Sequence, residues 1–445
     1  MRKSSATTSY RQRFVRVTRD SALTACFAFL LFTLVPFTRA SNGPDGSSLV
    51  STSTREGRLA VFDDVWETID ERYYDPTFRG LDWQIMRTTF RPLAAAAKGT
   101  EEFYAVLRQM IGPLQDAHTR VYSPEEKFDW WKPRFQNVGL SIREVEGQLT
   151  VVQVEPSSAG AKAGIHPGDV IFQIDGVLSS QVIARRLKQY GPSLDESTRF
   201  RVVTTLLEGT AGSPLILSWQ SQSGSVKSAK LQRGWTERRL GFQIKRRDHF
   251  VLIKIDAFTQ VIAAELTRAL PRTLKDAQGI VLDLRANGGG DAEAMSELAS
   301  VFLPDGTSLG RFADRSGASF ELRTNSKSLS VVAPFPKTNL PLVVLTSEST
   351  SSAAEILVAA LKRHDRARVI GTETCGCVLA IRNRHALPDG GVLDVSELDY
   401  RTADGTRLEG VGVKPDEVVN QRRRDIYSHR DEVLESARRF LKSGR

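Results

Sequence analysis

The chain has 445 residues, of which 40% are hydrophobic and 25% charged, a composition typical of a globular protein with several domains. Its net charge of +9 is concentrated near the start: residues 1–40 hold seven Lys and Arg against one Asp, which leaves +3 for the rest. Because no basic stripe with interleaved aromatic residues follows, we expect no nucleic-acid binding.

Residues 1–40 have the pattern of an export signal. A basic segment ends near Arg19, an apolar run of 16 residues extends from Ala22 to Phe37, and "TRASNG" follows with a cleavage site after Ala40. The apolar run is short for a membrane span of about 20 residues. We predict an exported protein, periplasmic or extracellular, with an uncleaved membrane anchor as the alternative.

The next segments predict a linker and a helical domain. Residues 41–57 are rich in Ser and Gly, as linkers are. From Leu59 onward apolar residues recur at helical spacing, and further helical patterns cover about 81–97 and 100–115. Residues 58–133 are therefore expected to form an N-terminal helical domain, with His118 at its exit in a turn or a first strand.

The remaining chain divides into a β-rich part, an α/β part and a basic tail. Short strands punctuated by Gly and Pro, with a helix near 181–191, predict a compact domain over 136–234. Strands and helices then alternate over 238–420, which predicts an α/β domain with a partly parallel sheet. Residues 421–445 predict a basic amphipathic helix.

Two turns at predicted strand ends carry chemistry, because sites in such sheets form at the carboxyl ends of the strands. "DLRANGGG" (283–290) lacks the endings of nucleotide-binding glycine loops, so its N–H groups suit an oxyanion better than a phosphate. "TSESTSSAAEILVAAL" (346–361) places four serines before a helix. These serines either cap the helix or include a nucleophile.

Four motifs in this order resemble the C-terminal processing (tail-specific) peptidases and their tricorn-core relatives: "LDLRANGGG", "STSSAAEI", "VIGTETCG" and "LEGVGVKPDE". "VGLSI" and "GAKAGIHPGDVIFQIDG" resemble a PDZ domain, and "VWETIDERYYDPTFRGLDW" with "LQDAHT" resembles the family's N-terminal domain. The resemblance spans roughly 58–420. It implies a multidomain α/β protein with a helical domain, a PDZ domain and a ClpP/crotonase-like peptidase core.

The resemblance also implies the residues of a peptidase site. The family nucleophile lies three residues before the Glu that opens the helix, which points from Glu355 to Ser352. The N–H of Ala353 and that of Gly289 or Gly290 are then the expected oxyanion donors. Arg285 is expected to pair with a core carboxylate.

In the PDZ segment, the backbone N–H groups of Gly139 and Leu140 are expected near a substrate carboxylate, with Ile142 on the same strand. An extended peptide would bind there as an added strand.

One position departs from the family pattern. Many members use a Ser–Lys dyad with Lys in "TFGKG", and the aligned residue here is Cys377. Either the chain is a degenerate enzyme, or it follows the tricorn-like branch, with His118 as the base and Glu409 as its orienting partner; Asp116 is the other candidate partner. The redox state of Cys377 and Cys375 stays open.

We therefore predict an exported serine endopeptidase that recognises protein C-termini or unfolded tails through its PDZ domain. No cofactor is implied, and the remaining histidines show no metal-ligand spacing. The alternatives are a catalytically degenerate PDZ scaffold and a retinoid- or lipid-binding protein on the same fold.

Overall fold

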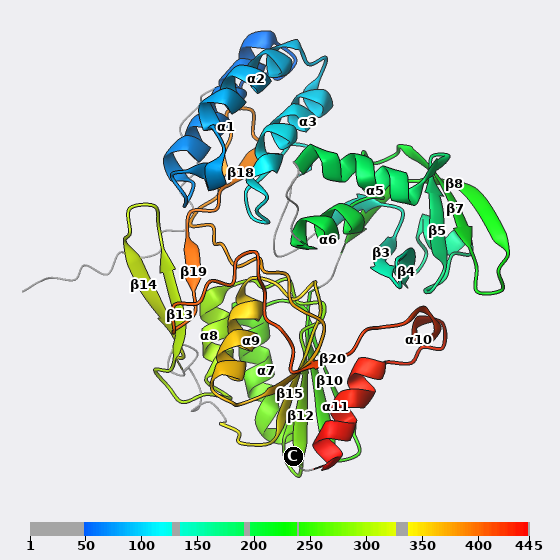
Figure 1. Cartoon of the computed structure of the whole chain (residues 1–445), viewed down its shortest axis with the longest axis vertical. Helices are drawn as coiled ribbons and strands as arrows, with labels where there is room; N and C mark the ends of the chain where they lie inside the picture. Colours follow the sequence, from blue (N-terminus) through cyan, green and yellow to red (C-terminus); the bar gives the residue numbers. More distant parts are fainter. Residues whose placement is uncertain (1–48, 127–133, 191–195, 238–239, 326–336, 444–445) are drawn as a thin grey trace, which may run out of the picture. The chain divides into compact units, whose positions relative to one another are not determined.

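The computed structural model describes residues 49–126, 134–190, 196–237, 240–325 and 337–443 (Figure 1). The predicted signal segment, the cleavage site after Ala40 and the first part of the predicted linker lie outside these residues. Within the described ranges, no helix is both long and apolar enough to cross a membrane.

The first described segment is helical, and aromatic side chains within it contact one another. Its helices are α1 (Arg55–Arg72), α2 (Trp83–Ala96) and α3 (Thr100–Ile111), with 3-10 turns η1 (Phe78–Gly80) and η2 (Gly112–Leu114). Trp66 and Trp83 each donate the indole N–H to the carbonyl of the other, which ties α1 to α2. The predicted linker boundary at residue 57 is wrong, because the Thr54 hydroxyl caps α1 by accepting the Gly57 N–H at 3.0 Å and starts the helix earlier.

A β-sheet with short helices follows. Its strands are β3 (Leu140–Val145), β4 (Gln148–Val154), β5 (Val170–Ile174), β6 (Val177–Leu178), β7 (Pro214–Gln220) and β8 (Val226–Gln232). Its helices are α4 (Ala159–Lys162), α5 (Ser179–Leu187), η3 (Lys188–Tyr190) and α6 (Glu196–Thr204). The strand order β3-β4-β5-β7-β8 leaves β3 at an edge, and α6 packs beside it.

The α/β part is built on a sheet with the order β10-β11-β12-β15-β16-β20. Its strands are β10 (Phe242–Arg247), β11 (Phe250–Ile255), β12 (Gly279–Asp283), β15 (Leu342–Thr346), β16 (Arg368–Gly371) and β20 (Glu417–Val418). From β11 to β20 neighbouring strands are parallel, and β10 is antiparallel. Every residue of β12 and β15 is buried, as expected for central parallel strands with both faces covered.

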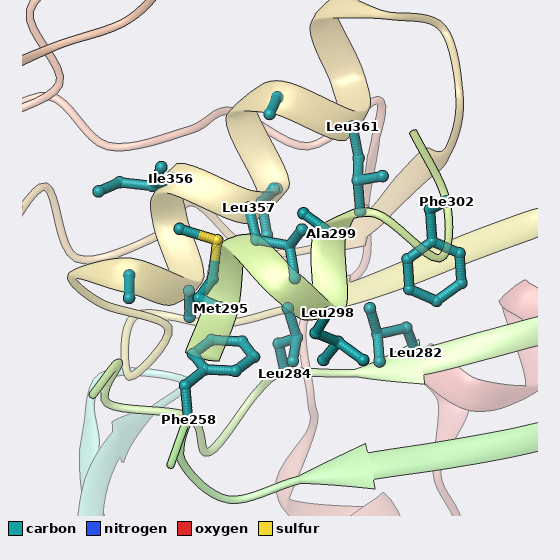
Figure 2. Packing of buried hydrophobic residues seen from close by; sticks show 14 of the residues in the cluster. Phe258, Leu282, Leu284, Met295, Leu298, Ala299, Phe302, Ile356, Leu357 and Leu361 are labelled. Carbon is teal, nitrogen blue, oxygen red and sulfur yellow. The ribbon is translucent and has the colours of Figure 1, made fainter. Parts of the chain in front are cut away.

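Helices α7 (Gln260–Thr273), α8 (Ala292–Ala299) and α9 (Ala353–Arg363) lie on one face of this sheet (Figure 1). Figure 2 shows the core between them, in which Met295 and Leu298 of α8 approach Leu357 of α9 and Leu282 of β12. This packing holds the start of α9 against the end of the sheet, where the candidate nucleophile lies.

The tail differs from its prediction. The sequence predicts one helix over 421–445, whereas the structure has α10 (Arg423–Tyr427) and α11 (Glu432–Ser443). Val433, Ala437 and Leu441 of α11 recur four residues apart and pack on the sheet face opposite α7 to α9 (Figure 1). The tail is therefore an integral layer of the α/β fold.

Smaller pairings complete the described elements. They are β1 (Arg120–Tyr122) with β18 (Val392–Asp394) and β17 (His385–Ala386), β2 (Arg134–Asn137) with β9 (Gly234–Glu237), and β13 (Ser308–Ala313) with β14 (Ser319–Arg323) and β19 (Asp399–Arg401).

The prediction that Arg285 pairs with a core carboxylate is confirmed. Its guanidinium contacts Asp283 and Asp431, each at 2.7 Å, so it links the end of β12 to the start of α11.

Since Asp283 is buried, Arg285→Ala should lower the free energy of unfolding by about 3–5 kcal/mol, measured by chemical denaturation. The control Arg323→Ala breaks an exposed pair and should lower the free energy of unfolding far less; equal costs would contradict the prediction.

Candidate active site

Two turns meet where the parallel strands β12 and β15 end. The register places the last residues of the two strands side by side, as predicted for a site at this edge. The serine turn (346–352) is bonded to the glycine turn (284–291). The Thr350 hydroxyl donates to a carbonyl of the glycine turn at 2.9 Å, and the Ser351 N–H donates to the Asn287 carbonyl at 3.1 Å.

Ser352 stands at the N-cap of α9 with φ 56° and ψ −127°, a region that non-glycine residues seldom adopt. Ser352 and Glu355 are placed as a capping box, with the Ser352 side chain toward the Glu355 N–H, but the hydroxyl makes no cap hydrogen bond within the described residues. The Ser352 side chain is partly exposed. Its N–H donates to the Cys377 carbonyl at 2.9 Å and to the Glu355 carboxylate at 3.1 Å. A strained turn between strand and helix that leaves a hydroxyl available is typical of a nucleophilic serine.

The glycine turn lies directly against this serine. A Cβ added to Gly289 would lie 2.6 Å from Ser352 Cβ and 3.0 Å from the Ala353 nitrogen. The Gly289 N–H, however, donates to Asn287 Oδ1 at 2.8 Å, so it is already engaged. In the described part of the chain, the N–H groups of Ala353 and Gly290 have no hydrogen-bond acceptor. These two donors are therefore the available pair for an oxyanion.

The two neighbouring glycines of this turn give a matched test. Gly289→Ala forces a Cβ into Ser352 at a backbone φ of +95°, and we expect kcat/KM to fall at least about 100-fold. At Gly288 the Cβ finds its nearest neighbour at 3.8 Å, so Gly288→Ala should keep activity within about threefold. Steady-state kinetics on both variants checks this, and similar rates would contradict the close approach.

Asn287 is a residue that the sequence interpretation missed. Its side chain is fully buried, Oδ1 fastens the Gly289 N–H, and Nδ2 has no partner among the described residues. The available signal was an Asn two residues before a glycine that needs a positive φ, because Asn side chains accept from such N–H groups.

Glu355 entered the sequence interpretation only as a marker for Ser352. Its buried carboxylate accepts from the Ser352 N–H, the Thr374 hydroxyl at 2.5 Å, the Gly376 N–H at 2.7 Å and the Cys377 N–H at 2.9 Å. Burial raises the pKa of Glu355 to about 7, against the lowering effect of these bonds. The carboxylate thus fastens the start of α9 to the segment that carries both cysteines.

Cys375 and Cys377, whose redox state the sequence left open, are joined by a disulfide in the structure. Cys377 is buried and Cys375 is partly exposed. The Arg201 guanidinium, on α6, lies 3.8 Å from Cys377 Sγ. Among the described residues, no group of three or more His, Cys, Asp or Glu side chains could hold a metal ion.

His118 lies just before β1 and is partly exposed, although its Nδ1 atom is buried. Its backbone N–H donates to Asp116 Oδ1 at 2.8 Å, and Nδ1 has no partner in the described ranges. Burial lowers the pKa of His118 to about 4; Asp116 raises it, and Arg120 and Arg201 lower it further. The imidazole is therefore neutral at pH 7. No hydrogen bond between described residues joins it to Ser352.

Glu409 lies beside the segment that follows the cysteines. Its Oε2 accepts the N–H groups of Val378 at 2.7 Å and Leu379 at 3.2 Å, and burial raises the pKa of Glu409 to about 8. Within the described residues, no hydrogen bond joins Glu409 to His118, the residue that it was predicted to orient. Asp116 Oδ1 accepts the backbone N–H of His118, and no hydrogen bond between described residues joins it to the ring.

The predicted peptide-binding residues lie at the edge strand β3. Leu140 and Ile142 are buried on it, and Gly139 precedes it with a φ of 75°. The Gly139 N–H donates to Asn137 Oδ1 at 2.7 Å, so it is engaged and not free for a carboxylate.

Comparison with known proteins decides the family. The model of Peptidase family S41 matches residues 249–419, and that of the Tricorn protease C1 domain matches residues 55–112. The carboxyl-terminal-processing protease of Picosynechococcus sp. is 30% identical over 369 residues, which cover 80% of this chain and 82% of that protein. The chain belongs to the carboxyl-terminal-processing proteases of peptidase family S41. As an S41 member it is a serine-type peptidase.

Further relatives agree with this assignment. The S41 chain is 28% identical over 368 residues to the carboxyl-terminal-processing protease of Synechocystis sp., covering 80% of this chain and 79% of that one. The structure of the photosystem II D1 C-terminal processing protease matches with a TM-score of 0.52 and 25% identity, covering 82% and 93% of the two chains. Mature CPAF in complex with lactacystin has a TM-score of 0.65 at 12% identity, covering 87% and 99%, which shows the fold alone. The predicted mixed α/β fold is thereby confirmed.

Proposed function

We propose that this S41 peptidase is an exported endopeptidase that cleaves proteins in C-terminal or unfolded tails, with Ser352 as its nucleophile. Ser352 attacks the scissile carbonyl, and the N–H groups of Ala353 and Gly290 bind the oxyanion that forms. The observation that carries the proposal is a partly exposed hydroxyl at the start of α9, on a strained backbone and near two N–H groups that have no acceptor among the described residues.

His118 is the proposed base. It takes the proton of the Ser352 hydroxyl and later returns it to the leaving amine. A pKa of about 4 keeps the imidazole able to accept a proton at neutral pH. Asp116, whose Oδ2 has no partner among the described residues, stabilises the imidazolium; Glu409 is the second candidate for this role.

Residues 136–234 are the proposed PDZ domain, between a helical domain (58–133) and the peptidase core (238–420). Edge strand β3 can accept an extended peptide as an added strand. Arg143 on β3 donates to Ser349 Oγ at 2.8 Å, three residues before Ser352. A tail bound along β3 therefore runs toward the serine turn.

Export rests on the pattern of residues 1–40, a basic segment followed by an apolar run and small residues. Substrates are then proteins of the periplasm or the cell exterior.

The test uses the full-length chain beside its Ser352→Ala variant. Casein should be cleaved by the wild type alone, as followed by gel electrophoresis and mass spectrometry. A synthetic unfolded peptide with a free C-terminal carboxylate should be cleaved faster than the same peptide with an amide in its place. Equal rates would remove carboxylate recognition from the proposal but leave the peptidase.

A catalytically degenerate PDZ scaffold is the second candidate. It is favoured by the sequence resemblance, which implies a dyad lysine at the position of Cys377, and by the disulfide in which Cys377 stands. This candidate predicts that the wild type and Ser352→Ala bind the free-carboxylate peptide equally, and that neither cleaves it or casein.

A further inference from the structure

We propose that the Cys375–Cys377 disulfide is a site of thiol–disulfide exchange with a low-molecular-weight thiol, and that this exchange controls the position of Ser352. The proposed thiol–disulfide exchange depends on the disulfide and its surroundings alone. The effect on catalysis rests on the proposed function of Ser352.

The ring closed by the disulfide is bonded directly to the serine turn. The Cys375 N–H donates to the Thr350 carbonyl at 2.9 Å, and the Cys377 carbonyl accepts the Ser352 N–H at 2.9 Å. The Cys377 N–H donates to the Glu355 carboxylate at 2.9 Å. Cys375 is therefore bonded to a residue before the candidate nucleophile, and Cys377 is bonded to Ser352 itself and to Glu355 after it.

The segment is also held from its other side. Gly376 has a φ of 69°, and a Cβ there would lie 2.8 Å from the Val411 nitrogen. Its carbonyl accepts the Gly410 N–H at 2.8 Å. With the disulfide intact, the ring closed by Cys375 and Cys377 is confined between the serine turn (346–352) and the loop at residues 410–411. A change in the shape of the ring is therefore transmitted to the Ser352 N–H.

The two sulfurs differ in access and in charge environment. Cys375 is partly exposed, whereas Cys377 is 1% exposed, so Cys375 is the half-cystine that an external thiolate is expected to attack. The departing thiolate is then that of Cys377, and the Arg201 guanidinium 3.8 Å from its sulfur stabilises the negative charge. A stabilised leaving thiolate speeds the exchange.

The exchange has two balanced steps. A thiolate of the small thiol attacks Cys375 Sγ, a mixed disulfide forms, and the bond to Cys377 breaks with its electron pair on Cys377 Sγ. A second thiolate attacks the small-molecule sulfur of that mixed disulfide and releases Cys375 as a thiolate. Two small thiols are oxidised to their disulfide, the protein disulfide is reduced to two thiols, and the two protons pass to the protein sulfurs.

Reduction should leave the fold intact. The disulfide spans a sequence separation of two, and the stabilisation by a cross-link falls as the closed loop shortens. The expected consequence is local: the ring opens, and the bond from the Ser352 N–H to the Cys377 carbonyl is no longer enforced.

The experiment uses the full-length chain with Cys26→Ser, so that Cys375 and Cys377 are its only cysteines. The protein is equilibrated in mixtures of reduced and oxidised glutathione, its thiols are trapped with a maleimide and counted by mass spectrometry, and casein cleavage is measured on the same samples. We expect the cleavage rate to fall at least about tenfold along the curve on which the thiols appear.

Two variants sharpen the test. The Cys375→Ser/Cys377→Ser variant should have one low rate in every mixture. Arg201→Gln removes the charge that stabilises the leaving thiolate, so half-reduction should need more reduced glutathione.

The inference is overturned if the pair stays oxidised in a large excess of reduced glutathione, or if thiols appear without a change in rate. If the oxidised wild type cleaves no more casein than Ser352→Ala, the proposed function fails separately. Hydrogen exchange of residues 350–356 then decides: faster exchange in the dithiol form supports the inference, and equal exchange rejects it.

Discussion

The Ser352→Ala variant is expected to cleave casein about 10⁶-fold more slowly than the wild type, because removal of a serine nucleophile leaves only substrate binding and oxyanion stabilisation. The free energy of unfolding should fall by about 1 kcal/mol or less, the usual cost of replacing an N-cap serine by alanine. Single-turnover assays with excess enzyme measure the residual rate, and chemical denaturation measures the stability.

Ser351→Ala is the matched control. Ser351 is the preceding residue, it is also partly exposed, and its bonds to Asn287 and Ala354 use backbone atoms that the substitution keeps. We expect its activity within about threefold of the wild type. If Ser351→Ala lost activity and Ser352→Ala retained it, Ser351 would be the nucleophile. That result would contradict the role that we propose for Ser352.

The His118→Ala variant should lose about 10²–10⁴-fold in kcat/KM, the usual contribution of a general base. In the wild type, kcat/KM should stay flat as the pH falls through 6.5, because burial has lowered the pKa of His118 to about 4 and the imidazole remains unprotonated. The acid limb should appear only near pH 4. A limb near 6.5 would contradict the lowered pKa of His118.

The lowered pKa of His118 also makes the free energy of unfolding depend on pH. The unfolded state, with a histidine pKa near 6.5, binds more protons than the folded state between pH 4 and 6.5, so stability is lost as the pH falls through that window. Relative to His118→Ala, the wild type should lose about 3 kcal/mol of unfolding free energy between pH 7 and pH 4.

The fold of the α/β part was accessible from the sequence because its signals are local. The buried apolar runs of β12 and β15 and the helical period of α9 lie within single segments. Ser352 followed from its distance to Glu355 within one motif. The tail was less accessible: the apolar positions of α11 were visible, but the sheet face that they cover was not.

The candidate site shows where local reasoning ends. Sequence placed the Gly289 N–H among the oxyanion donors, yet the neighbouring Asn287 side chain occupies it, and the available glycine donor is that of Gly290. Sequence also paired Glu409 with His118; in the structure Glu409 accepts the Val378 N–H and Asp116 accepts the His118 backbone N–H, so the partner of the imidazole stays a prediction. Both points concern the hydrogen-bond partner that a polar group finds in the folded chain.

The sequence by itself determined the reactive residue types, their order and the turns that carry them, because hydrophobic period, glycine turns and motif spacing are properties of neighbouring residues. Only the tertiary structure decided which donors remain available, which carboxylate accepts the His118 backbone N–H, and that Arg201 stands beside Cys377. Arg201 and Cys377 are 176 positions apart in the chain, and such contacts arise from the packing of whole elements against one another.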